Sequence, residues 1–180
     1  MPATPHNTDP IRIRDALVAA VLEAADPARA VAASKFPDNF QPRAVLATGK
    51  ASAPMAEAAL ARLGDQVTTG AITCVPDHED RLREACVHHP SITIHPADHP
   101  LATARNRAAA DAIATMADQL ARGCTDTLVL ISGGASAHLT SPAGSLTLDD
   151  LRTTTDALLR AGATNPELNN DRKPSETLKR

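Results

Sequence analysis

The chain has 180 residues, 43% of them hydrophobic and 22% charged, with a formal net charge of -3 at pH 7 and two aromatic side chains, Phe36 and Phe40. This length is sufficient for one substantial core, and the composition is that of a folded protein. Because basic and acidic residues are interspersed and rings for base stacking are nearly absent, the sequence argues against a nucleic-acid partner.

The first predicted elements are a tail and a helix. Residues 1–9 are polar and interrupted by prolines, which predicts a flexible tail, and residues 10–180 are expected to form a single α/β domain. Apolar residues recur at helical spacing over residues 13–22, in a segment that ends near residues 26–27. This pattern predicts a helix with one apolar face, and we expect that face to cover a sheet.

Four short apolar runs follow, and none of them alternates between apolar and polar residues. Continuous Val, Leu and Ile content is typical of strands buried on both faces, and the helical patterns between the runs supply the crossovers of a parallel sheet. The sequence therefore predicts an α/β fold, a Rossmann-like three-layer α/β/α sandwich with a mainly parallel sheet. The predicted strands are residues 43–47, 70–75, 91–94 and 127–131.

Apolar spacing and capping residues predict the helices of the second half. An apolar stripe over residues 109–120 should pack on the sheet. Thr147 is expected to cap the helix after the last strand, and Gly162 is expected to end it. Residues 165–166, Asn-Pro, predict the N-cap and first position of a final short helix that Pro174 ends early.

The first candidate site follows the first strand, at residues 47–52. Unpaired N–H groups at a helix start carry partial positive charge, Gly49 lets a ligand approach the backbone, and Lys50 adds a full charge for a phosphate or carboxylate. The segment is not a Walker A loop, because Ala44 and Ala51 replace its glycine and its hydroxyl residue. A tight turn with a solvated lysine is the alternative interpretation.

The second candidate site follows the last strand, at residues 131–138. Its two glycines and two hydroxyl residues, Gly133, Gly134, Ser132 and Ser136, are able to form a backbone nest around phosphate oxygens. A flexible turn is the alternative, but ligands of parallel sheets bind at the carboxyl edge of the strands. We therefore expect both turns to face one hollow that binds a phosphate-bearing small molecule.

Two other site classes are considered. Residues 134–137 match the first four positions of the G-x-S-x-G nucleophile elbow around Ser136, but His138 replaces the closing glycine, which argues against a serine hydrolase. A histidine cluster suggests a metal site, but its spacing is irregular and we predict no metal ligands. The cluster contains His78, Cys86, His88, His89, His95 and His99.

Cysteine usage and hydropathy bear on the compartment. Three cysteines without a C-x-x-C pair argue against a disulfide framework and favour reduced thiols. The first residues show no signal-peptide pattern, and no run approaches the ~20 apolar residues that span a bilayer. We therefore expect a cytoplasmic protein with no membrane partner.

Three segments together resemble the N-terminal lobe of the type II glycerate 2-kinases. That lobe contains a G-x-G-K-A segment, a His-Pro pair and an S-G-G-G-S-A segment, and here residues 47–51, 99–100 and 132–137 stand in the same order. The resemblance implies ATP-dependent transfer of the γ-phosphoryl group to the 2-hydroxyl of D-glycerate, giving 2-phosphoglycerate, with Mg²⁺. The likeness continues over residues 146–151, 158–163 and 167–173.

The resemblance also implies roles for individual residues. Lys50 is similar to the family's active-site lysine, and its catalytic role would be to neutralise charge on the transferring phosphoryl group. The other residues implied to bind substrate or nucleotide are Gly49, Ser132, Gly133, Gly134, Ser136, Arg172 and Lys173.

Members of this family also contain a second, leucine-rich lobe that is absent here. The first hypothesis is therefore an enzyme that is incomplete alone. Its expected partners are ATP, glycerate or a similar hydroxy acid, and a separately encoded second lobe, and a second copy in a homodimer is a further candidate. The alternative is a non-catalytic nucleotide-binding or anion-binding remnant with a regulatory role. Departures from the family pattern at Ala135, Pro174 and Glu176 motivate this alternative.

Overall fold

The structure of the protein is a computed structural model that describes residues 9–179. Up to residue 8, the tail predicted over residues 1–9 lies outside the described residues. Asp9 belongs to the first helix rather than to a loose tail, because its carboxylate accepts a 3.0 Å hydrogen bond from the Ile11 N–H and caps α1 (Pro10–Ala24).

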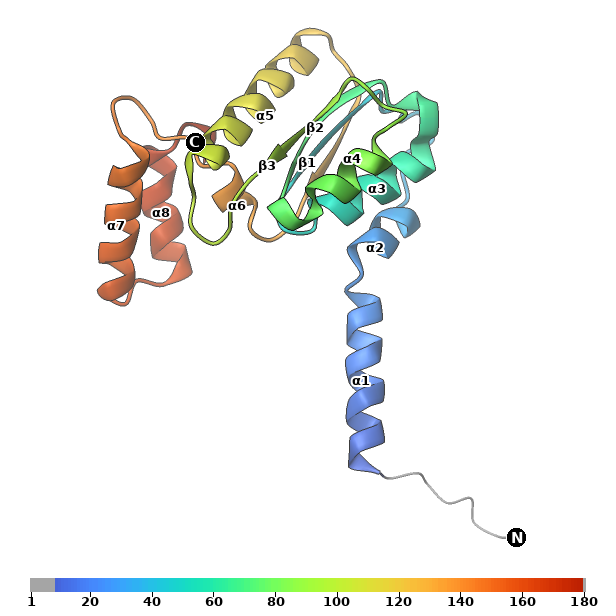
Figure 1. Ribbon diagram of the computed structural model, residues 1–180, viewed down its shortest axis with the longest axis horizontal. Coiled ribbons are helices and arrows are strands. Elements are labelled where there is room, and N and C mark those ends of the chain that lie inside the picture. Colours follow the sequence, from blue (N-terminus) through green and yellow to red (C-terminus); the bar gives the residue numbers. More distant parts are fainter. Residues whose placement is uncertain (1–8, 180) are drawn as a thin grey trace.

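A parallel sheet forms the centre of the fold (Figure 1). It has four strands, in the order β3-β2-β1-β4. The chain adds β2 and β3 on one side of β1 and then returns to place β4 on the other side. Such a reversal is a topological switch point, where a crevice opens at the carboxyl ends of two neighbouring strands. The strands are β1 (Ala44–Thr48), β2 (Thr69–Cys74), β3 (Ile92–Pro96) and β4 (Thr127–Ile131), close to the predicted runs.

Helices cover both faces of the sheet, which confirms the predicted three-layer α/β/α sandwich. On one face, α3 (Ser52–Leu63) and α4 (Glu79–Ala85) enclose the larger core, and α2 (Pro27–Ala33) packs against α3. On the other face, α5 (Ala104–Arg122) covers β2 and β3 with its predicted stripe, of which Ile113 is a buried member. Short 3-10 helices occur at Gly64–Gln66, Pro76–His78 and Thr177–Lys179.

The helix after the short α6 (Ala135–His138) has the predicted boundaries. The Thr147 hydroxyl accepts a 3.1 Å bond from the Asp150 N–H, and the Asp150 carboxylate accepts a 2.7 Å bond from the Thr147 N–H. This reciprocal capping box starts α7 (Leu148–Arg160). Gly162, with a φ of +82°, follows the last turn as the predicted C-terminal stop.

The final helix, α8 (Asn165–Ser175), differs from the prediction at both ends. Its N-cap is Thr164 rather than Asn165, because Thr164 forms a capping box with Glu167, whose carboxylate accepts a 2.7 Å bond from the Thr164 N–H. Pro174 does not end the helix early. It lies in the last turn, where a proline removes only one of the terminal hydrogen bonds.

The outer strands are not buried on both faces, so that prediction is wrong for them. In β4, Val129 is 54% exposed and Ile131 is 67% exposed, and in β3 Ile92 is the buried residue. The reason is strand order. Because β3 and β4 are the edges of the sheet and α5 lies mainly over β2 and β3, the face of β4 that contains Val129 and Ile131 lies outside the cover of α5.

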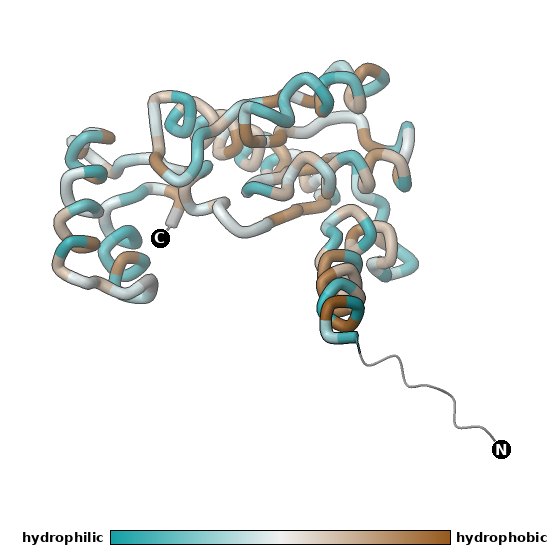
Figure 2. Tube along the Cα trace, turned by 60° about the horizontal axis from the view of Figure 1, so that its bottom comes forward, coloured by the Kyte–Doolittle hydropathy of each residue, from teal (hydrophilic) through white to brown (hydrophobic). Residues whose placement is uncertain are grey.

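Helix α1 covers no sheet, in contrast to the expectation from its apolar face. None of its residues is buried, and it extends away from the sandwich with hydrophobic positions recurring along its length (Figures 1 and 2). Across residues 9–179, no helix combines the length and apolar character needed to cross a bilayer. The exposed apolar residues of α1 are Ile11, Ile13, Leu17, Val18, Val21 and Leu22.

Candidate anion-binding site

The turns that follow β1 and β4 meet at the switch point. The Lys50 N–H donates a 2.9 Å hydrogen bond to the Gly133 carbonyl, and the Ala51 N–H donates a 3.0 Å bond to the Ser132 hydroxyl. The Ser132 N–H donates in turn to the Thr48 carbonyl at 3.0 Å. The two turns predicted to share a hollow are therefore in direct contact, although 81 positions separate Ala51 from Ser132.

Gly49 makes this contact possible. Its φ is +105°, a conformation that residues with side chains rarely adopt. A β-carbon at this position would lie 2.4 Å from the Ser132 hydroxyl oxygen and 2.5 Å from its carbonyl oxygen. The sequence predicts that a ligand approaches the Gly49 backbone. In the structure, Ser132 takes that place instead.

The N–H groups of Lys50, Ala51 and Ser52, at and just before the start of α3, are engaged within the protein, whereas the sequence predicts that such groups attract an anion. Lys50 and Ala51 donate to the other turn, and the Ser52 N–H donates to the Gly49 carbonyl at 3.1 Å. The sheet order causes this difference, because it places a carbonyl and a hydroxyl of the second turn directly over the first.

Free donors lie on the turn after β4. Within residues 9–179, the N–H groups of Gly133, Gly134 and Ser136 donate to no protein group. Gly134 has a φ of +89°, and a left-handed residue in a turn directs neighbouring N–H groups into a concavity that attracts anions. We call these three N–H groups the nest.

Lys50 and His99 flank the nest. A β-carbon at Gly134 would lie 2.9 Å from the Lys50 Cγ and 3.0 Å from the His99 Cδ2, so both side chains pack against this glycine. Among the described residues, the Lys50 ammonium forms no ion pair. His99 is absent from the predicted site residues, although the His-Pro pair that contains it is one of the segments that carry the resemblance.

A buried histidine lies beneath the nest, at the end of α6. His138 is fully buried, and its Nδ1 lies 3.0 Å from the Thr73 hydroxyl, which donates to the Thr48 hydroxyl at 2.9 Å. Burial lowers the pKa of His138 to about 4, with a further lowering from His99 and an opposing effect of Asp98. The ring is therefore neutral near pH 7 and connects α6 to the ends of β1 and β2.

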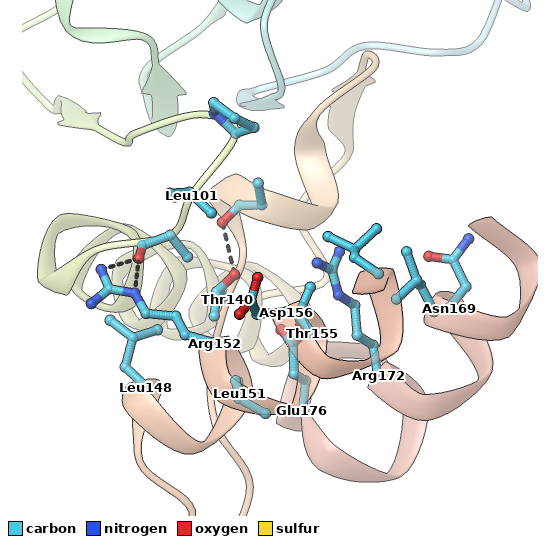
Figure 3. A pocket seen from close by; sticks show the side chains of 15 residues that line it. Leu101, Thr140, Leu148, Leu151, Arg152, Thr155, Asp156, Asn169, Arg172 and Glu176 are labelled. Atoms are coloured by element: carbon cyan, nitrogen blue, oxygen red, sulfur yellow. Dashed lines mark hydrogen bonds between the residues drawn. The ribbon is translucent and has the colours of Figure 1, made fainter. Parts of the chain in front are cut away.

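A cavity of about 470 Å³ adjoins the nest, between α7, α8 and the loop after β3 (Figure 3). Pro100, which directly follows His99, and Ala137, in the helix after the nest, both line it. Arg172 also lines the cavity, whereas Lys173 is exposed and is not part of its lining. Of the two predicted anion-binding residues of α8, the structure thus brings only Arg172 to this region.

The geometry around Ser136 lacks the base that a serine hydrolase needs. In the described part of the chain, the Ser136 hydroxyl makes no hydrogen bond to a histidine, and Nδ1 of the neighbouring His138 lies against Thr73. The same part of the chain contains no group of three or more His, Cys, Asp or Glu residues arranged to hold a metal ion.

Comparison with known families identifies the relatives of this fold. A family model described as a domain of unknown function, DUF4147, matches residues 13–179. The chain belongs to this family, the N-terminal domain of the glycerate kinase family. The resemblance inferred from the three segments is thereby confirmed.

Members of the glycerate kinase family are among its similar proteins. It is 29% identical over 158 residues to a protein of Thermotoga maritima named D-glycerate 2-kinase, and 38% identical over 170 residues to a protein of Agrobacterium vitis named as a hydroxypyruvate reductase. It matches the crystal structure of the glycerate kinase from Thermotoga maritima with a TM-score of 0.74 at 27% identity, over 92% of this chain and 38% of that one. The alignments cover 93% and 88% of this chain but 36% of each curated relative, so it spans just over a third of their length.

Three of the departures from the glycerate kinase pattern lie in defined local structures. Ala135 begins α6 without a positive φ, because Gly134 takes that conformation instead. Pro174 lies within the last turn of α8. Glu176 is 2% exposed and forms an antiparallel bridge with Pro142, which ties the chain after α8 to the segment before α7.

Proposed function

We propose that the chain binds the phosphates of ATP at the nest and takes part in transfer of the γ-phosphoryl group to the 2-hydroxyl of D-glycerate. The observation that carries the proposal is that Lys50 meets the three N–H groups of the nest at the switch point, and that the part of the chain the structure describes offers none of them a partner. Backbone N–H groups and a lysine ammonium are the usual ligands of phosphate oxygens. The name of the Thermotoga maritima relative supports the choice of reaction.

Each residue has a distinct role in this proposal. Phosphoryl transfer requires positioning and stabilisation of negative charge, and Lys50 and the nest supply both at one place. Ser132 is a positioning residue, because its hydroxyl accepts from the Ala51 N–H and contacts the Thr48 carbonyl at 3.3 Å. Gly49 permits that contact. His99 packs against Gly134 beside the nest.

The Asp98 carboxylate does not fit the role of a Mg²⁺ ligand beside the nest. Mg²⁺ in proteins prefers carboxylate oxygens, and Asp98 is the carboxylate nearest in sequence to His99. The Asp98 carboxylate already accepts a hydrogen bond from the Thr103 hydroxyl and lies 3.7 Å from the Arg105 guanidinium. We therefore assign no step of the reaction to a metal held by these residues.

Turnover in this proposal requires a further polypeptide that corresponds to the rest of the relatives' length. Two apolar surfaces without cover support it: the stripe of α1 and the face of β4 that contains Val129 and Ile131. Exposed apolar patches of this kind are typical of interfaces. A second copy of the chain is the alternative partner for the same surfaces.

Co-expression tests this requirement. We expect the part of the Agrobacterium vitis relative that lies outside the alignment to co-purify with the chain and to give ATP-dependent phosphorylation of glycerate. Val129→Glu should prevent co-purification, because it places a charge on the apolar face of β4, whereas Val87→Glu, at a residue that is 67% exposed elsewhere, should not. Full turnover by the chain alone, or a homodimer that Val129→Glu separates, would contradict the proposed partner.

Replacement of Lys50 tests the phosphate site itself. Lys50→Ala should weaken binding of ATP and of inorganic tripolyphosphate by about 10-fold to 100-fold, since a hydrogen bond from a charged donor contributes about 1.5–3 kcal/mol. Isothermal titration calorimetry measures both affinities. Lys35→Ala, which removes an exposed lysine that follows α2, is the matched control and should leave both affinities unchanged. Equal affinities for wild type and Lys50→Ala would refute a role for Lys50 in phosphate binding.

A further inference from the structure

The cavity beside the nest is larger than a three-carbon acid requires. Its volume of about 470 Å³ is within the range of about 300–1,000 Å³ usual for sites that bind drug-sized molecules. Apolar side chains from α7 and α8, including the buried Leu151 and Leu168, form part of its wall (Figure 3). Glycerate alone would leave most of this apolar surface uncovered.

The charged side chains that line the cavity balance each other. Two arginines, Arg152 and Arg172, and two carboxylates, Asp156 and Glu176, are present. A polyphosphate needs an excess of positive charge, which the nest with its lysine offers and the cavity does not. The cavity therefore suits the uncharged part of a ligand whose charged part lies at the nest.

Two side chains of α8 fit recognition of a nucleobase. Asn169 and Arg172 are three positions apart, so they lie on the same face of the helix, and both line the cavity (Figure 3). A side-chain amide pairs with the N6 and N7 edge of adenine, and a guanidinium plane stacks on an aromatic base. Arg172 forms no ion pair with any residue that the structure describes, so its guanidinium is available for stacking.

One molecule is able to occupy the cavity and the nest together, because Pro100 and Ala137 belong to the cavity wall while His99 and Gly134 flank or form the nest. We propose that this cavity is the nucleoside subsite of the phosphoryl donor, with base and ribose between α7, α8 and the loop after β3. The phosphates then extend to the nest. This inference rests on the ATP-binding function proposed above and adds the place and the chemistry of the nucleoside.

Three probes separate the two parts of the site: ATP, adenosine and inorganic tripolyphosphate, each titrated calorimetrically into the full chain. Thr155 lines the cavity from α7, and Thr155→Trp should fill it. We expect the affinity of this variant for ATP to fall by about tenfold or more and its binding of adenosine to be lost. Its affinity for tripolyphosphate should equal that of the wild type. Unchanged tripolyphosphate binding also shows that the variant is folded.

Asn169→Ala provides a second test that does not crowd the fold, because the Asn169 side chain is exposed apart from its cavity contact. This variant should bind ATP about tenfold more weakly and show a smaller preference for ATP over GTP. Its affinity for tripolyphosphate should be unchanged. Thr153→Trp, on the exposed side of α7, is the matched control and should bind all three probes as wild type does.

The outcomes distinguish this inference from the proposed function. If Thr155→Trp and Asn169→Ala bind ATP as tightly as wild type, or if wild type binds tripolyphosphate as tightly as ATP and does not bind adenosine, the nucleoside subsite is refuted while the nest remains. If wild type binds neither ATP nor tripolyphosphate, the proposed function and the subsite both fail.

Discussion

Gly49→Ala is expected to lower the free energy of unfolding by about 3 kcal/mol and to abolish anion binding at the nest. A residue with a side chain at a φ of +105° costs roughly 1–2 kcal/mol, and relief of the overlap with Ser132 costs about 1–3 kcal/mol more. The overlap involves the Ser132 backbone, so its relief displaces the turn that carries the nest. Thermal denaturation should show a decrease in Tm of about 6–12 °C for this chain length.

Gly64→Ala is the matched control for Gly49→Ala. Gly64 also has a positive φ, of +53°, but a β-carbon there would meet nothing within 4 Å. This variant should lose only about 1 kcal/mol, from the backbone conformation alone, and should keep its affinity for tripolyphosphate. Equal losses of stability and binding in the two variants would show that contact with Ser132 is not the reason for glycine at position 49.

The parts of the fold that local sequence determines could be predicted. The run over residues 127–131 forms a strand with the predicted bounds, and Thr147 caps α7 through the residue pair that the capping rule requires. Exposure of Val129 and Ile131 was not predictable in this way. It depends on β4 being an edge strand outside the cover of α5, which follows from strand order rather than from the residues of the strand itself.

In the candidate site, too, local sequence predicts some features and contacts between distant segments determine the others. Residue types in the turns after β1 and β4 predict that these turns meet, and they do. The sequence does not show that the Gly133 carbonyl and the Ser132 hydroxyl accept hydrogen bonds from the N–H groups of Lys50 and Ala51. That pairing depends on contacts between distant segments. His99 reaches Gly134 for a similar reason, through the position of the loop after β3.

Stability of the fold should decrease in acid because of His138. In the folded chain its pKa is lowered from 6.5 to about 4, by burial first and by His99 second. Between these values the unfolded chain binds a proton that the folded chain does not, so the stabilising effect is complete above about pH 6.5 and is lost as the pH falls toward 4. The loss over this interval should be about 3 kcal/mol, measured by urea denaturation at a series of pH values.

His138→Gln should remove this pH dependence, because a glutamine amide is able to bond to the Thr73 hydroxyl but does not titrate. Asp150 and Glu167 also have lowered pKa values, through hydrogen bonds from Thr147 and Thr164, but their stabilising effect is lost at lower pH than that of His138. His88→Gln, at an exposed histidine, should keep the wild-type profile. Parallel profiles for wild type and His138→Gln between pH 6.5 and 4 would mean that the Thr48, Thr73 and His138 network tolerates a charged ring, and that acid acts on the fold elsewhere.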